Sequence, residues 1–331
     1  MTSPESLEAP SRDELFRKPK KNGSVSVVNA PHLLTPIADT HAHLQMLDDP
    51  ALAPARAGAH EVAFVETIVD VAEDGGCRSL TFQQLEEWIR SAQLDVRQMG
   101  SLCCGQAPYD VPRVRIAVGV HPHNAKEYTP QVESDLIRCL EDERVSAVGE
   151  IGLDYHYDLS PREDQKEVFA RQISIAQEAQ LPVALHVREA FDDAYAILEK
   201  AGWNPSGVLL HCYTSDAEEV KRWVAAGCFV AFGGALTFGR SDGIRAAIHE
   251  VPQDRLLLET DAPFMAPVPL RGQPCEPAQV VFTAERALAE LLGEGASQAE
   301  RIELLQMTYQ NALTLLDRGP TAWQQRGEFH A

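Results

Sequence analysis

The sequence has no long apolar run. No stretch approaches the roughly 18 consecutive apolar residues that a membrane-spanning helix needs. Residues 1–22 are rich in Pro, Ser, Glu and Lys and lack the apolar core of a secretory signal. We therefore expect a cytoplasmic protein without a membrane segment, in which residues 1–32 form a disordered N-terminal tail.

Paired cysteine motifs are also missing. The seven cysteines are odd in number and show no Cys-x-x-Cys spacing. In a chain without a secretory signal, this pattern predicts reduced thiols rather than a disulfide framework.

Positive charge is scarce. The 29 Lys and Arg residues face 49 Asp and Glu residues, which gives a net charge of −20. This balance argues against sequence-independent binding along duplex nucleic acid, which depends on Lys and Arg to release counterions. It does not exclude a small site that handles one phosphate group, because bound divalent cations can reverse the local charge.

A regular alternation is present instead. Hydrophobic residues make up 44% of the chain and charged residues 24%, as in ordinary globular proteins. Eight short apolar runs alternate with helical stretches, and most of them end at a polar residue. The runs are 33–38, 61–68, 114–120, 145–149, 181–185, 207–210, 228–232 and 255–258.

This alternation predicts an α/β fold, a TIM-type (β/α)₈ barrel, as a single domain over residues 33–317. Residues 318–331 then form a C-terminal tail. The alternative is an open doubly wound sheet. The barrel is favoured because polar residues end six of the runs, and because no Gly-rich phosphate loop follows the first run.

One connection, residues 70–112, is longer than a crossover requires. A helix over 81–97 would be sufficient, and loop-like segments at 70–80 and 98–112 flank it. The first of these would lie at the carboxyl ends of the strands, where TIM barrels carry their sites. We expect it to shape access to any site there.

The polar residues that end the runs are potential metal ligands. Imidazole and carboxylate groups bind Zn²⁺, Mn²⁺ and Mg²⁺. Any one of these histidines could be a core histidine bonded to the backbone, but five of the eleven histidines at strand ends is hard to explain in that way. The set is His41, His43, His121, Glu150, His186, His211 and Asp261.

Six of these ligands exceed the need of one catalytic ion, so two divalent ions (Mg, Mn or Zn) are expected. With Glu150 as a bridge, one ion would take His41, His43 and Asp261, and the other His186 and His211. Two ions in this arrangement suit the splitting of a phosphoester or acyl bond. Asp261 is the expected general base and Glu150 its catalytic partner.

Two further residues have alternative roles. Arg188, two residues after His186, could hold a phosphate oxygen through its planar donors, or form a surface ion pair. Glu259 could orient a ligand histidine, or be a buried partner of a basic side chain.

Several motifs together resemble the TatD family of metal-dependent deoxyribonucleases, in the amidohydrolase-like superfamily, over residues 35–316. They are DTHAHL (39–44), GVHPH (119–123), GEIGLDY (149–155), LHVREA (185–190), HC (211–212), ETDAPF (259–264) and APVPLRGQPCEP (266–277). The resemblance implies a TIM-type barrel, two-metal hydrolysis of DNA, the six ligands named above, and His121 as a substrate phosphate contact.

Three functions follow as hypotheses. The leading one is hydrolysis of phosphodiesters at DNA ends or single strands, by a monomer that binds DNA transiently. The second keeps the metals but acts on a cyclic amide, lactone or aminoacyl ester. The third is a metal-bound regulatory protein without turnover.

Overall fold

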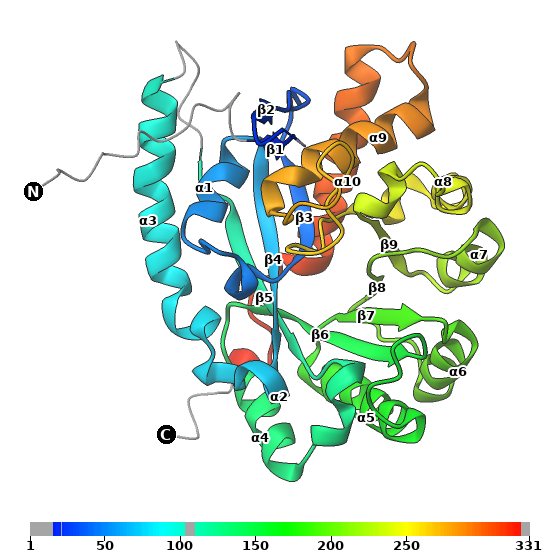
Figure 1. The fold of residues 1–331 in the computed structure, drawn as a ribbon. Coiled ribbons are helices and arrows are strands. Elements are labelled where there is room, and N and C mark those ends of the chain that lie inside the picture. The colour runs from blue at the N-terminus through cyan, green and yellow to red at the C-terminus, as the bar shows by residue number, and fades with distance from the viewer. Residues whose placement is uncertain (1–15, 21, 103–109, 326–331) are drawn as a thin grey trace, which may run out of the picture.

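The protein forms a barrel of parallel strands, shown in Figure 1. The computed structural model describes residues 16–20, 22–102 and 110–325. Within them, each strand of an 8-stranded sheet pairs in parallel with the next strand along the chain. The strands are β3 (Ile37–Ala42), β4 (Val62–Asp70), β5 (Arg113–Gly119), β6 (Val145–Asp154), β7 (Val183–Arg188), β8 (Val208–Leu210), β9 (Phe229–Phe232) and β10 (Leu256–Leu258).

The barrel closes where the first and last strands meet. Ala42 and Ala262 form a parallel bridge, and the His43 amide donates to the Ala262 carbonyl at 2.7 Å. Buried Asp39 reinforces this seam by accepting hydrogen bonds from the Thr260 amide (2.8 Å) and hydroxyl (2.6 Å). The predicted TIM-type barrel is confirmed, and the open sheet is wrong.

Helices cover the outside of the barrel (Figure 1). Several begin at residues that accept hydrogen bonds from free amides of the first turn, such as Thr129, Asp216 and Ser297. The helices are α1 (Leu52–Gly58), α2 (Val71–Asp74), α3 (Leu80–Leu102), α4 (Pro130–Cys139), α5 (Arg162–Ala179), α6 (Phe191–Ala201), α7 (Ala217–Ala225), α8 (Asp242–Ile248), α9 (Val280–Leu292) and α10 (Gln298–Leu316). None of the helices within the described ranges is long and apolar enough to cross a membrane.

Small side chains fill part of the barrel interior. Ala117, Ala147, Ala184 and Ala231 belong to one buried cluster with the last turns of α10. Alanines let the strands pack closely around the axis and leave the polar residues to occupy the carboxyl ends of the strands.

The first strand differs from its prediction. The run 33–38 was expected to end before the histidine pair, but β3 spans Ile37–Ala42. Pro36 lacks an amide hydrogen to donate to a ladder, so pairing begins after it. His41 therefore lies inside the strand and His43 directly after it.

The expected N-terminal disorder is wrong for the described part of residues 1–32. β1 (Arg17–Pro19) and β2 (Val25–Val27) form an antiparallel pair. Phe16 is buried, with its ring centroid 5.1 Å from that of Phe282. This aromatic contact packs the segment against α9, and Lys18 Nζ also donates to the Pro269 carbonyl at 2.6 Å. Residues 1–15 and 21 lie outside the described residues.

The cysteine prediction is wrong for one pair. Cys77 and Cys139 form a disulfide with Cα atoms 5.4 Å apart and 62 residues of separation in sequence. The segment after β4 brings a 3₁₀ turn, η3 (Gly76–Arg78), against α4, and sequence spacing cannot reveal that contact. Cys212, Cys228 and Cys275 are free thiols, and Cys103 and Cys104 lie outside the described residues.

Candidate metal centre

The predicted ligands converge at the carboxyl ends of the strands. His43, Glu150, His186, His211 and Asp261 line one cavity of about 830 Å³. His41 is fully buried in β3, and its ring stacks on that of His211 with centroids 3.8 Å apart. Residues that are up to 220 positions apart in the chain thus meet in a single site.

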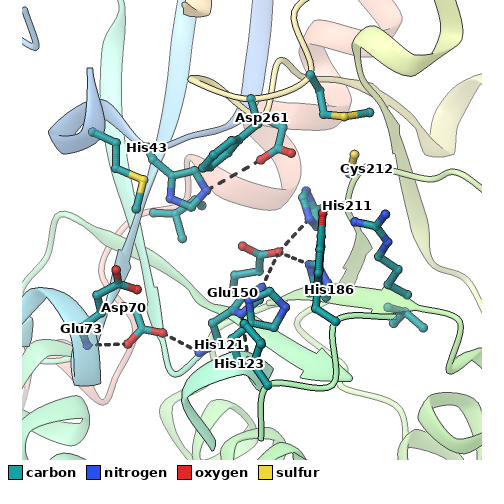
Figure 2. A pocket seen from close by; sticks show the side chains of 18 of the residues that line it. His43, Asp70, Glu73, His121, His123, Glu150, His186, His211, Cys212 and Asp261 are labelled. Atoms are coloured by element: carbon teal, nitrogen blue, oxygen red, sulfur yellow. Dashed lines mark hydrogen bonds and ion pairs between the residues drawn. The ribbon is translucent and has the colours of Figure 1, made fainter. Parts of the chain in front are cut away.

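Glu150 occupies the centre of this site (Figure 2). Its Oε1 lies 2.6 Å from His186 Nδ1 and 2.8 Å from His211 Nε2. Its Oε2 faces the other way and lies 3.3 Å from His41 Nε2. The two carboxylate oxygens of Glu150 therefore contact two different groups of histidines.

Asp261 completes the group on the His41 side. Its Oδ1 lies 3.8 Å from His43 Nε2 and 3.9 Å from His41 Nε2. Asp261 also has a φ of +61°, a left-handed conformation that costs a non-glycine residue about 1 kcal/mol. The contact between β3 and the segment after β10 stabilises this conformation, because the Asp261 amide donates to the His41 carbonyl at 2.9 Å.

The charges in the site are mutually dependent. Burial disfavours a charged Glu150, but the surrounding histidines, His211 first among them, hold the pKa of its carboxyl well below the usual value. Burial also disfavours a charged His211, yet Glu150 and Glu259 raise its pKa well above the usual value. Burial lowers the pKa of His41, which favours the neutral imidazole that binds metals.

The donor set fits divalent cations. Among the described residues, both ring nitrogens of His41 and Nδ1 of His211 are buried without a hydrogen-bond partner. Unpaired buried polar atoms are costly, and a cation bound to His41 Nε2, the nitrogen that faces Glu150, would satisfy one of them. The ligand atoms of His41, His43 and Glu150 lie close enough to share one ion, and so do those of Glu150, His186 and His211.

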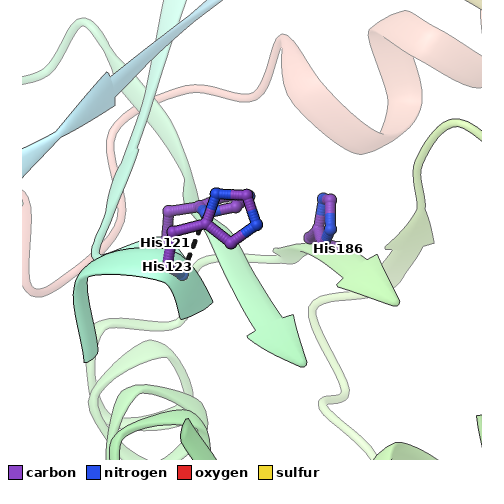
Figure 3. Close-up of side chains that lie close together, drawn as sticks. All are labelled: His121, His123 and His186. Carbon is purple, nitrogen blue, oxygen red and sulfur yellow. Dashed lines mark hydrogen bonds between the residues drawn. The ribbon is translucent and has the colours of Figure 1, made fainter. Parts of the chain in front are cut away.

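The structure also places His123 and Asp154 in the site, and neither belongs to the predicted ligand set. His123 groups with His121 and His186 (Figure 3). His123 and His186 each place Nε2 about 3 Å from Oδ2 of buried Asp154, at 2.9 and 3.0 Å. The signal for His123 was the His-Pro-His motif, which repeats the spacing of His41 and His43.

We expect Asp154→Asn to weaken metal binding about 10- to 100-fold. The Asp154 carboxylate accepts from His186 Nε2, which fixes the ring so that Nδ1 faces Glu150. Titration calorimetry with Mn²⁺ measures the change. Asp158→Asn alters an exposed carboxylate in the loop that follows Asp154 and is the matched control. Equal affinities in the two variants would contradict an orienting role for Asp154.

The remaining predicted residues also lie at the cavity. His121 Nε2 is 3.6 Å from Glu150 Oε1, and burial lowers its pKa to about 4. Arg188 lines the cavity with its guanidinium 4.8 Å from the Tyr157 ring centroid. Glu259 Oε1 accepts from the Cys212 amide at 2.7 Å and lies 3.4 Å from His211 Nδ1, which favours orientation of a histidine over pairing with a basic side chain.

The end of β4 and the following helix α2 form an acidic wall of the cavity, made of Asp70, Glu73 and Asp74. Asp70 begins α2 by accepting from the amides of Ala72 and Glu73. Its other oxygen accepts from the His121 amide at 2.7 Å. The start of the connection between β4 and β5 therefore lines the cavity and contacts the backbone of His121.

A TIM-type barrel with histidines and carboxylates clustered at the carboxyl ends of its strands defines a metal-dependent hydrolase. Residues 38–317 match the model of the family described as TatD related DNase. The chain belongs to this family, as its motifs indicated.

Similar proteins agree with this assignment. The chain is 36% identical over 256 residues to the "Uncharacterized metal-dependent hydrolase YabD" of Bacillus subtilis, covering 76% of this chain and 90% of that protein. It is 38% identical over 205 residues to the "3'-5' ssDNA/RNA exonuclease TatD" of Pantoea vagans, covering 60% and 75%. The crystal structure of YjjV, a TatD homologue of Escherichia coli K12, superposes with a TM-score of 0.66 at 25% identity, covering 85% of this chain and 98% of that one.

Proposed function

We propose that the protein hydrolyses phosphodiester bonds of DNA, as an exonuclease on single strands or ends. One observation carries the proposal: the Glu150 carboxylate lies between two groups of histidines, with one oxygen toward each. A relative that is named a single-strand exonuclease supports the choice of substrate.

The residues divide into two sets around Glu150. His41, His43 and Asp261 would hold one divalent ion with Glu150, and His186 and His211 would hold the other. Mg²⁺, Mn²⁺ and Zn²⁺ all suit these donors. When bound, such ions supply Lewis-acid activation of the phosphate and of the attacking water.

The side chains supply proton handling and orientation. Burial opposes a charged Asp261, but the contact with His43 and the neighbouring histidines lower the pKa of its carboxyl. An ionised carboxylate at this place can accept the proton of the attacking water. His121 and Arg188 both line the cavity, where they can donate to phosphate oxygens and orient them.

The test offers the purified protein single- and double-stranded DNA labelled at the 3′ or the 5′ end. With Mn²⁺ or Mg²⁺ we expect stepwise shortening of single strands from one end, loss of activity with EDTA, and recovery when the metal is returned. A cyclic amide, a lactone and an aminoacyl ester serve as competing substrates. Hydrolysis of one of these without DNA cleavage overturns the proposal. The cytoplasmic location and the monomeric state stay predictions.

A further inference from the structure

The cavity mouth has an apolar rim that the proposed chemistry does not use. Tyr157, Leu159, Phe264 and Met46 line the cavity and are 55%, 54%, 52% and 42% exposed. Exposed apolar groups gathered at the edge of a site indicate a surface that a ligand covers. Two of the four are aromatic, and the faces of their rings can stack on flat ligands.

The two aromatic rings belong to different sides of the metal centre. Phe264 contacts His43, with ring centroids 5.9 Å apart in an edge-to-face arrangement. Tyr157 contacts His123 in the same manner at 5.5 Å. Figure 2 shows His43 and His123 on different sides of Glu150, so the two rings that contact them lie on different sides of the candidate metal centre.

Charge limits how this cavity can hold a nucleic acid. In the described part of the chain, Arg188 is the single Lys or Arg that lines the cavity. The acidic wall of Asp70, Glu73 and Asp74 lies on the same cavity. Because phosphate contacts through Lys and Arg normally dominate affinity, a chain with a net charge of −20 needs another source of binding energy for the nucleotides that the divalent ions do not contact.

We propose that Tyr157 and Phe264 are stacking platforms for unpaired bases on either side of the scissile phosphate, and that they make the enzyme select single-stranded nucleic acid. This inference rests on the proposed phosphodiesterase function. Bases in a duplex are already stacked and cannot be splayed onto protein rings without disrupting pairing. The acidic wall acts in the same direction, since it repels the phosphates of a second strand.

The contacts of Tyr157 fit this role. The Arg188 guanidinium lies over one face of its ring, so a base would stack on the opposite face. The Tyr157 amide donates to Asp154 Oδ1 at 2.8 Å. The carboxylate that orients His186 therefore also anchors the loop that carries the platform. The Phe264 amide donates to the Asp261 carbonyl at 2.7 Å, so the second platform is tied to the proposed general base.

The experiment distinguishes binding that needs the face of an aromatic ring from binding that needs only an apolar side chain. Phe264→Leu and Tyr157→Leu remove the aromatic face and keep apolar volume, whereas Phe264→Trp and Tyr157→Phe keep the face. Leu94→Ala alters an equally exposed apolar residue on α3 and is the matched control. The KM for oligodeoxythymidine is measured, and then for the same strand with tetrahydrofuran residues replacing the last two nucleotides at each end.

We expect each leucine variant to raise the KM for the base-bearing strand about 5- to 150-fold, the range of one lost base stack. The KM of the aromatic variants and of the control should stay close to that of the unaltered protein. On the strand with base-free ends, the KM of the leucine variants should be nearly equal to that of the unaltered protein.

Equal KM changes on base-bearing and base-free strands would overturn the stacking role and leave the proposed function standing. Leucine variants whose KM equals that of the control on both strands would also overturn the stacking role and leave the proposed function standing. If the unaltered protein cleaves neither strand with any of the divalent ions, both proposals fail together.

Discussion

Replacing Glu150 by glutamine should lower kcat for DNA hydrolysis about 10³-fold or more. The carboxylate is the group that both histidine sets share, and its loss removes a negative charge from the centre of the site. Lewis-acid stabilisation by a bound ion is worth several kcal/mol, and each 1.36 kcal/mol corresponds to about a tenfold change in rate.

The measurement combines single-turnover kinetics with metal analysis of the purified variant. Glu163→Gln, on the exposed first turn of α5, is the matched control and should keep full activity and metal content. If Glu150→Gln bound two equivalents of metal and turned over normally, Glu150 could not bridge two ions.

Replacing Asp39 by alanine should lower the free energy of unfolding by about 3 kcal/mol or more. The carboxylate accepts from the Thr260 amide, the Thr260 hydroxyl and the His41 amide at the barrel seam. Each buried donor left without a partner costs about 1–3 kcal/mol. Urea denaturation at pH 7, with the metal removed, measures the loss.

Asp39→Asn sharpens this test, because it keeps the shape and one acceptor oxygen. Burial raises the pKa of the Asp39 carboxyl well above its usual value, which lowers the cost of replacing the carboxyl group by a neutral amide. We expect the asparagine variant to lose less than half as much stability as the alanine variant. Asp164→Ala, an exposed position on α5, should change nothing measurable. Equal stability of Asp39→Ala and Asp164→Ala would rule out a stabilising seam.

Much of the fold could be predicted because its signals are local. Parallel strands buried on both faces are continuous apolar runs, and the eight runs correspond to the eight strands in order. The candidate metal ligands are also local signals, since each follows or ends a run. Their convergence required one further assumption, that the runs close into a barrel.

The predictions that were wrong or incomplete concern contacts between segments that are distant in sequence. The disulfide of Cys77 and Cys139 depends on how the long connection packs against α4. Phe16 packs against α9 although the sequence around it predicts a disordered tail. His123 was not placed in the site because it follows β5 in a 3₁₀ turn, and only the structure brings it to Asp154.

The closure of the barrel has a consequence for synthesis of the protein. Asp39 and Thr260 are 221 residues apart, and their contact joins the first strand of the barrel to the segment after the last. A chain still emerging from the ribosome carries the His41–His43 pair long before Asp261 exists. Closing so long a loop is slow and comes late in folding. The six candidate ligands are therefore not all present until 261 of the 331 residues have been translated, and a fragment that ends before Asp261 lacks one of them.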